Sequence, residues 1–234
     1  MEERMEITLI GTSHIARESI LEIKQAFKNL QPQMVAVELD AERAAALQEG
    51  QKRRISFRQM LQVGWKGMLF AKIGQYVQQH LGKMVGVDPG AEMKAALELA
   101  REHRIPVALI DQPIRVTLRN ISSQLTWKEK GRFLQDLLKG IFFRKKYLRE
   151  QGLDSLDLRK VPSHELIEKL LGEVQKHYPS LYRVLVEDRN RYMVRQLVKL
   201  LRLHPGKKIL VIVGAGHKKG MEELLAKGVD KVPT

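Results

Sequence analysis

Two short apolar runs at opposite ends of the chain each end in a glycine that a histidine follows three residues later. The first run, residues 7–10, leads into Gly11-Thr12-Ser13-His14, and the last, residues 209–213, leads into Gly214-Ala215-Gly216-His217. Both runs are short, rich in β-branched residues and bounded by glycine, which predicts buried β-strands. Each histidine then lies just past the carboxyl end of a strand, where open α/β sheets bind ligands. We expect a sheet to bring the two imidazoles together.

Strand-like and helical segments alternate near both ends of the chain. Two more apolar runs, residues 34–37 and 107–110, are followed directly by Glu38 and Asp111. Strands that alternate with amphipathic helices indicate a parallel sheet covered on both faces. We therefore predict an α/β fold with a mostly parallel central sheet flanked by helices.

The middle of the chain breaks this alternation. A chain of 234 residues can form one compact body, so we predict a single domain over residues 1–234, with helical inserts at about 51–87 and 127–171. The first insert has no acidic residue, and the second carries aromatic beside basic side chains at residues 139–147. Such segments pack on the sheet as helical hairpins or lie on a membrane interface. The methionines and tryptophan of the first insert also favour a homo-oligomer.

The formal net charge of +14 favours an anionic membrane surface or nucleic acid as a partner. Nucleic acid is the least favoured, because zinc-finger spacing, a basic zipper and an RNA-binding aromatic signature are all missing. No run approaches the roughly 18–20 apolar residues of a membrane span, and the charged first residues do not resemble a signal peptide. We expect a cytoplasmic or membrane-peripheral protein, or the soluble part of a longer membrane protein.

Four polar side chains follow the four strand-like runs: His14, Glu38, Asp111 and His217. Polar residues also begin wherever burial stops, so each one alone has a purely structural explanation. Together, two imidazoles and a carboxylate suit zinc, manganese, iron or cobalt. Alternatively, the amides near Gly214 bind an anion at the start of the next helix.

Other cofactor chemistry is disfavoured. The chain has no cysteine, which excludes thiolate chemistry and iron–sulfur clusters. The turn at residues 214–220 misses the dinucleotide fingerprint by one residue, and no phosphate-binding loop is present, so we expect no nucleotide cofactor. Gly11, Gly214 and Gly216 are expected to let the backbone turn sharply and approach a ligand.

The penultimate helical segment opens with charged residues. Asp188 and Arg189 either form a solvated first turn, where an acid suits the helix dipole, or face the pocket at the strand ends. In the pocket they would orient a ligand or balance its charge.

Several phrases follow one another in a fixed order along the chain. They are GTSH at 11–14, VELD at 37–40 with Arg43, GAEM at 90–93, LID at 109–111 with TLR at 117–119, DRNRYM at 188–193 and GAGH at 214–217. This ordered set resembles the TraB/PrgY family of pheromone-shutdown proteins, which is distantly similar to the Tiki metalloproteases. The resemblance implies an EreA/ChaN-like α/β core in which His14, Glu38 and His217 share a site. Gln112 and Asp188 depart from the usual arginine and glutamate of the family.

The resemblance and the strand ends together favour a divalent-metal-dependent hydrolase that acts on a peptide, as in pheromone inactivation. His14, Glu38 and His217 would hold the metal. The candidates for stabilising developing negative charge or holding a substrate carboxylate are Arg43, Arg119 and Arg189. The candidates for a general base or a ligand-orienting group are Glu92, Asp111 and Asp188.

The alternative is a non-catalytic peptide-binding or regulatory module associated with a membrane surface. There the same histidines would be hydrogen-bonded pocket residues, and the basic inserts would dock on lipid. Gln112, in place of an arginine, favours this alternative.

Overall fold

The computed structural model describes residues 7–12, 17–48, 90–142 and 164–227. Four parallel strands form its central sheet in the order β1-β4-β2-β3. They are β1 (Ile7–Thr12), β2 (Met34–Val37), β3 (Val107–Leu109) and β4 (Ile209–Gly214). The predicted parallel α/β fold is confirmed, and the first and last of the described strands, β1 and β4, are neighbours. The narrower likeness to the EreA/ChaN-like fold stays a prediction.

The register of the sheet brings the carboxyl ends of the strands to one edge. Thr12 at the end of β1 pairs with Gly214 at the end of β4. Val37, the last residue of β2, pairs with Ile212 of β4 and with Leu109, the last residue of β3. Whatever follows each strand therefore begins near the same edge.

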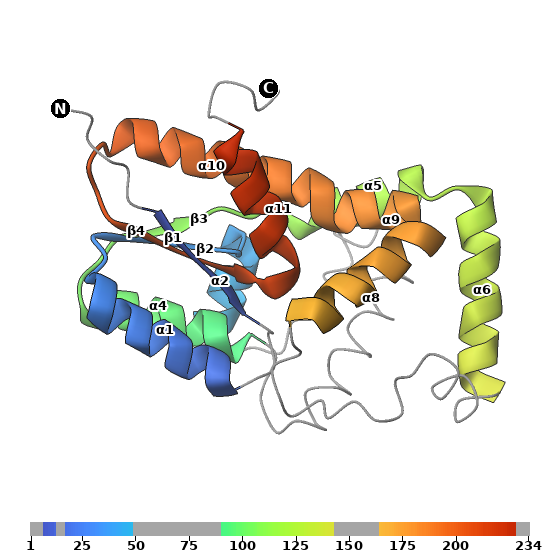
Figure 1. The fold of residues 1–234 in the computed structure, drawn as a ribbon, viewed down its shortest axis with the longest axis horizontal. Coiled ribbons are helices and arrows are strands. Elements are labelled where there is room, and N and C mark those ends of the chain that lie inside the picture. Colours follow the sequence, from blue (N-terminus) through green and yellow to red (C-terminus); the bar gives the residue numbers. More distant parts are fainter. Residues whose placement is uncertain (1–6, 13–16, 49–89, 143–163, 228–234) are drawn as a thin grey trace.

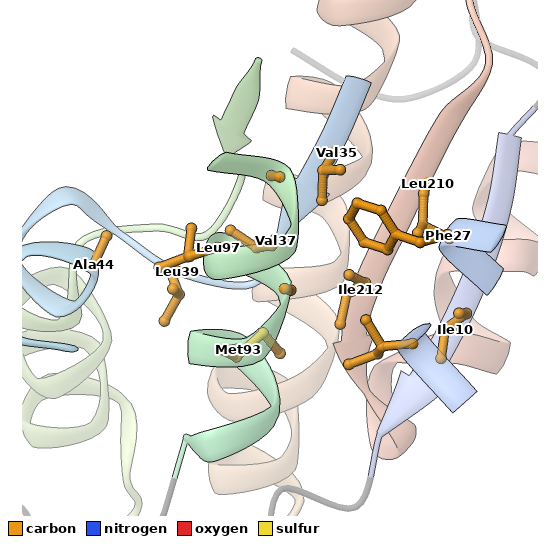
Figure 2. Packing of buried hydrophobic residues seen from close by; sticks show 13 residues of the cluster. Ile10, Phe27, Val35, Val37, Leu39, Ala44, Met93, Leu97, Leu210 and Ile212 are labelled. Atoms are coloured by element: carbon orange, nitrogen blue, oxygen red, sulfur yellow. The ribbon is translucent and has the colours of Figure 1, made fainter. Parts of the chain in front are cut away.

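Helices cover both faces of the sheet (Figure 1). On one face lie α1 (Arg17–Leu30) and α4 (Ala91–Glu102), and on the other α10 (Asp188–Leu203) and α11 (Ala215–Ala226). Because successive strand side chains point to opposite faces, the apolar runs of β2 and β4 supply both cores. The α1/α4 core, shown in Figure 2, contains Ile10, Ile23, Phe27, Val35, Val37, Met93, Leu97, Leu210 and Ile212. The α10/α11 core contains Met34, Ala36, Met193, Leu197, Ile209, Val211, Val213 and Met221.

The two outer strands are less buried than the two inner strands. Every residue of β2 and β4 is buried, whereas Thr8 of β1 and both Val107 and Leu109 of β3 are exposed. Edge strands have a neighbour on one side alone, and their helices cover them incompletely. The predicted burial therefore fails at Thr8 of β1, whereas Ile10 and Thr12 of the same strand are buried.

The remaining helices lie toward the end of the molecule where the strands finish (Figure 1). They are α2 (Ala41–Gln48), α5 (Ile114–Gln124), α6 (Trp127–Phe142), α8 (His164–His177), α9 (Pro179–Tyr182) and a five-residue π-helix, η1 (Arg183–Glu187), which runs directly into α10. The predicted insert at 127–171 includes α6 and the start of α8, and its residues 143–163 lie outside the described residues, as does the predicted insert at 51–87. In the part of the chain that the structure describes, no helix is both long enough and apolar enough to cross a membrane.

Candidate functional site

Three of the four predicted strand-end side chains meet at the carboxyl edge of the sheet. Glu38 follows β2, Asp111 follows β3, and His217 lies in the first turn of α11, just after β4. All three are buried, with 5%, 5% and 7% of their surface exposed, respectively. His14 would follow β1 at the same edge, but it lies outside the described residues.

Glu38 is held by the neighbouring strand β4. Its main-chain N–H donates to the Ile212 carbonyl at 3.0 Å, and its Oε2 accepts a 2.6 Å hydrogen bond from the Gly214 N–H. The other carboxylate oxygen, Oε1, faces His217 Nε2 at 3.4 Å. One side of the carboxylate is thus anchored to the sheet while the other points into the site.

Arg189 of α10 joins the three side chains. Its Nε and Nη2 donate to the two oxygens of Asp111 at 3.1 and 2.6 Å. Nη2 also donates to Glu38 Oε1, and Nη1 lies 2.9 Å from His217 Nε2. Burial lowers the pKa of this guanidinium, but the charges of Glu38 and Asp111 outweigh burial and raise the pKa above its ordinary value. Arg189 is therefore a permanent cation at the centre of the site.

The tautomer of His217 follows from its two partners. A guanidinium N–H can donate but not accept, so His217 Nε2 accepts from Arg189. The ring proton then resides on Nδ1, which lies 2.7 Å from Asn190 Oδ1 and donates to it. Two consecutive residues of α10, Arg189 and Asn190, thus hold opposite nitrogens of one neutral imidazole.

A second arginine extends the network toward α2 and α5. Arg43 donates through Nε to Asp40 at 3.0 Å and through Nη2 to Asp111. Asp40 caps α2 by accepting from the Arg43 main-chain N–H at 2.8 Å, and it accepts the Ile114 N–H at 3.0 Å. Burial raises the pKa of Asp40, but the hydrogen bonds from Arg43 and Ile114 and the charge of Arg43 outweigh it, so the pKa is lowered.

We call Glu38, Asp40, Arg43, Asp111, Arg189, Asn190 and His217 the strand-end cluster. It contains three carboxylates and two guanidiniums, and His217 is neutral. Within this buried cluster each guanidinium pairs with two of the carboxylates.

Other sequence candidates lie outside the cluster. Arg119 is exposed on α5, Asp188 pairs with Arg191 at 3.1 Å, and Glu92 is buried in the first turn of α4. Among the described residues, which leave out His14, no group of three or more histidines and carboxylates is arranged to hold a metal ion.

The glycines serve packing more than sharp turns. A Cβ on Gly11 would lie 3.1 Å from the Ala215 Cα, so this glycine lets α11 approach β1. Gly214 has an ordinary extended backbone, with φ of −61°, and a Cβ on Gly216 would make an ordinary 3.5 Å contact with Leu171. Neither Gly214 nor Gly216 therefore has a backbone conformation that only glycine adopts.

The amino-acid sequence is similar to one known protein family and to several individual proteins. The family model described as "TraB/PrgY/gumN family" matches residues 2–229. The chain belongs to the TraB/PrgY/gumN family. It is 32% identical to an uncharacterised protein of Methanocaldococcus jannaschii, over 95% of this chain and 54% of that protein. It is 26% and 25% identical to TraB domain-containing proteins of Bos taurus and Homo sapiens, again over 95% of this chain and 63% of each relative. The chain thus spans about half to two thirds of the length of these relatives.

In this TraB/PrgY/gumN family member, sequence reasoning missed two members of the strand-end cluster as site residues. Asp40 carries a local signal, because an aspartate before Ala-Glu-Arg-Ala-Ala-Ala is typical of a helix N-cap. Asn190 is 4% exposed, yet its position next to Arg189 in a helix gives no sequence signal for a contact with His217.

Proposed function

We propose that this TraB/PrgY/gumN family protein is a divalent-metal-dependent hydrolase acting on peptides, in which Glu38 and His217, together with His14, hold the metal. The observation that carries the proposal is the convergence of Glu38 Oε1 and His217 Nε2, 3.4 Å apart in a buried site. This separation suits two donors of one metal ion, whose bonds to N and O are about 2.0–2.2 Å long.

The chemistry of the donors fits such an ion. His217 is neutral, and its second nitrogen is held by Asn190, the kind of outer hydrogen bond that orients metal-binding histidines. Glu38 is oriented in the same way by the Gly214 N–H. A neutral imidazole and a carboxylate are donors that suit Zn²⁺, Mn²⁺, Co²⁺ or Fe²⁺. A divalent cation held there would supply Lewis-acid polarisation of a peptide carbonyl.

The arginines and Asp111 receive different roles in this proposal. The Arg43 side chain is 22% exposed and that of Arg189 is 14% exposed, so both retain some access to a substrate. They would stabilise negative charge that develops on a peptide oxygen, or bind a substrate carboxylate. Asp111 already accepts from both arginines and from the Gln112 N–H. We therefore assign it the positioning of the two guanidiniums rather than general-base work.

The test combines metal analysis with peptide cleavage. The purified protein is analysed for bound metal and assayed on a peptide library with Mn²⁺, Co²⁺ and Zn²⁺. His14→Ala and His217→Ala should each lose bound metal and cleavage, whereas His103→Ala, at an exposed position after α4, should keep both. If both site variants keep the metal content and cleavage of the wild type, the proposal is wrong.

A second candidate function is a non-catalytic peptide-binding or regulatory module at a membrane surface. The observation that favours it is that Arg189 already donates hydrogen bonds to Glu38 and His217, the residues that would otherwise bind a metal. The net charge of +14 would supply the attraction to lipid. Sedimentation with vesicles containing phosphatidylserine should then capture the protein at low salt and release it as salt screens the charges. Equal sedimentation with neutral phosphatidylcholine vesicles would count against the membrane part of this candidate.

A further inference from the structure

The lone pair of His217 Nε2 is already in use in this structure. A neutral imidazole has one nitrogen with a free lone pair and one that carries the proton. The proton is on Nδ1, facing Asn190 Oδ1 at 2.7 Å, and Nε2 accepts from Arg189 Nη1 at 2.9 Å. A metal ion and the Arg189 N–H therefore compete for the same pair of electrons.

From this competition we infer that Arg189 is an internal cation that occupies the proposed metal position, so that metal binding requires its guanidinium to leave His217 and Glu38. The inference rests on the proposed function, because it concerns the same pair of ligands. The guanidinium donates to Glu38 as well as to His217, so it covers both donor atoms at once. A divalent ion and a guanidinium side by side in a buried site would also repel each other strongly.

Arg189 also has hydrogen-bond acceptors other than the two proposed metal ligands, Glu38 and His217. Nε and Nη2 donate to the two oxygens of Asp111 at 3.1 and 2.6 Å. Nη1 also lies 3.3 Å from the Leu185 carbonyl in the π-helix. A modest rotation that releases His217 and Glu38 can therefore keep the guanidinium bound to Asp111 and Leu185. On withdrawal, the N–H groups that face Asp111 and Leu185 keep their acceptors, which limits the free-energy cost of the movement.

The first experiment measures metal affinity, not activity. Mn²⁺ is titrated calorimetrically into the wild type, Arg189→Ala and Arg191→Ala. Arg191 is the matched control, because it lies on the same helix with its side chain 44% exposed and paired with Asp188. Each variant thus removes one positive charge from α10. Since the affinity of a site scales with the fraction of molecules in which it is open, we expect the Kd of Arg189→Ala to fall about tenfold or more, and that of Arg191→Ala to stay within about twofold.

A second experiment adds a free guanidinium compound to Arg189→Ala, in place of the side chain that the substitution removes. Methylguanidinium at millimolar concentration should weaken Mn²⁺ binding to Arg189→Ala by re-entering the vacated position. The same addition should leave the wild type and Arg191→Ala unchanged. If Arg189→Ala binds Mn²⁺ no more tightly than the wild type, the inference is overturned while the proposed function stands. If no form of the protein binds a divalent metal, both fail.

A measurement on the wild type keeps the inference testable if Arg189→Ala does not fold. Nitrogen-15 NMR follows the imidazole nitrogens of His217 and the guanidinium nitrogens of Arg189 as diamagnetic Zn²⁺ is added. We expect Nε2 of His217 and the Nη signals of Arg189 to change together over one titration. A Zn²⁺-dependent change at His217 with unchanged Arg189 signals would overturn the inference.

Discussion

The main-chain N–H of Gly214 donates a 2.6 Å hydrogen bond to Oε2 of Glu38, although the two residues are 176 positions apart in the chain. The pairing of Val37 with Ile212 in the parallel sheet brings them together. The bond fixes the carboxylate so that its other oxygen meets Arg189 and His217. The orientation of Glu38 within the strand-end cluster is therefore a direct consequence of the register between β2 and β4.

Replacing Glu38 by glutamine should destabilise the fold. The amide has one acceptor oxygen, so its NH₂ group must face either the Gly214 N–H or the donors of Arg189. The charge that pairs with a buried arginine is also lost. Breaking a buried pair typically costs about 3–5 kcal/mol, and urea unfolding of Glu38→Gln should show a loss of this order.

The matched control for this variant is Glu98→Gln. Glu98 lies on the surface of α4, with its side chain 50% exposed and 3.9 Å from Lys94. Exposed ion pairs contribute about 0–1 kcal/mol to stability. The free energy of unfolding of this variant should therefore be close to that of the wild type. Similar losses in the two variants would mean that the buried pairing of Glu38 contributes little to stability.

Gly220 makes room for the amide that holds His217. A Cβ at this position would lie 2.4 Å from Asn190 Nδ2, so the Asn190 amide would have to shift from the position in which it holds His217. Alanine in a helix gains about 1 kcal/mol over glycine, but overpacking costs about 1–3 kcal/mol. We expect Gly220→Ala to be less stable than the wild type in urea unfolding, and its His217 Nδ1 proton to exchange faster in NMR.

Gly172 provides the comparison, because it lies in α8 and a Cβ there would meet nothing within 4 Å. Gly172→Ala should therefore be more stable than the wild type by about 0.5–1 kcal/mol. If the two alanine variants shift stability in the same direction, the contact between Gly220 and Asn190 does not constrain this helix.

The meeting of Glu38, Asp111 and His217 could be predicted because it depends on the ends of strands. Short apolar runs locate the strands, and a parallel arrangement brings their carboxyl ends to one edge. The side chains just past those ends then share a site without knowledge of any helix. The same reasoning places His14, but that placement stays a prediction.

The arginine network could not be predicted, because it depends on how each helix is rotated. In α5 the buried residues are Thr117 and Ile121. Arg119 lies midway between them, on the opposite side of the helix, and is exposed for that reason. In α10, Arg189 and Asn190 both reach His217 directly after a π-helix. Wider turns of this kind often occur at functional sites, but apolar periodicity does not reveal them.

Gly90, the residue directly before α4, has a left-handed backbone with a φ of 84°. Non-glycine residues adopt this conformation at a cost of about 1–2 kcal/mol, and a Cβ would also lie 3.2 Å from a methyl group of Leu47. Gly90→Ala should lower the free energy of unfolding by about this amount. Gly90→Asn should lose less, because asparagine tolerates the left-handed region better. Thermal unfolding of the two variants distinguishes backbone strain from simple crowding, since crowding alone would make asparagine the worse substitute.

Glu129 joins the start of α6 to α9 and makes the stability of this contact depend on pH. Its Oε2 accepts from the N–H and hydroxyl of Thr126 at 2.9 and 2.7 Å, and its Oε1 accepts from the Ser180 N–H at 2.7 Å. Burial raises the pKa of Glu129, but these hydrogen bonds outweigh burial and lower the pKa below its ordinary value of 4.5.

A carboxyl whose pKa is lowered by folding stabilises the protein above its unfolded pKa, and this contribution is lost as the pH falls through the folded pKa. The wild type should therefore be more stable than Glu129→Gln near pH 7. The difference should begin to shrink as the pH drops below about 4.5. Urea unfolding of both proteins between pH 7 and pH 3 measures this difference directly. A difference that stays constant across the range would show that Glu129 acts through shape rather than through its charge.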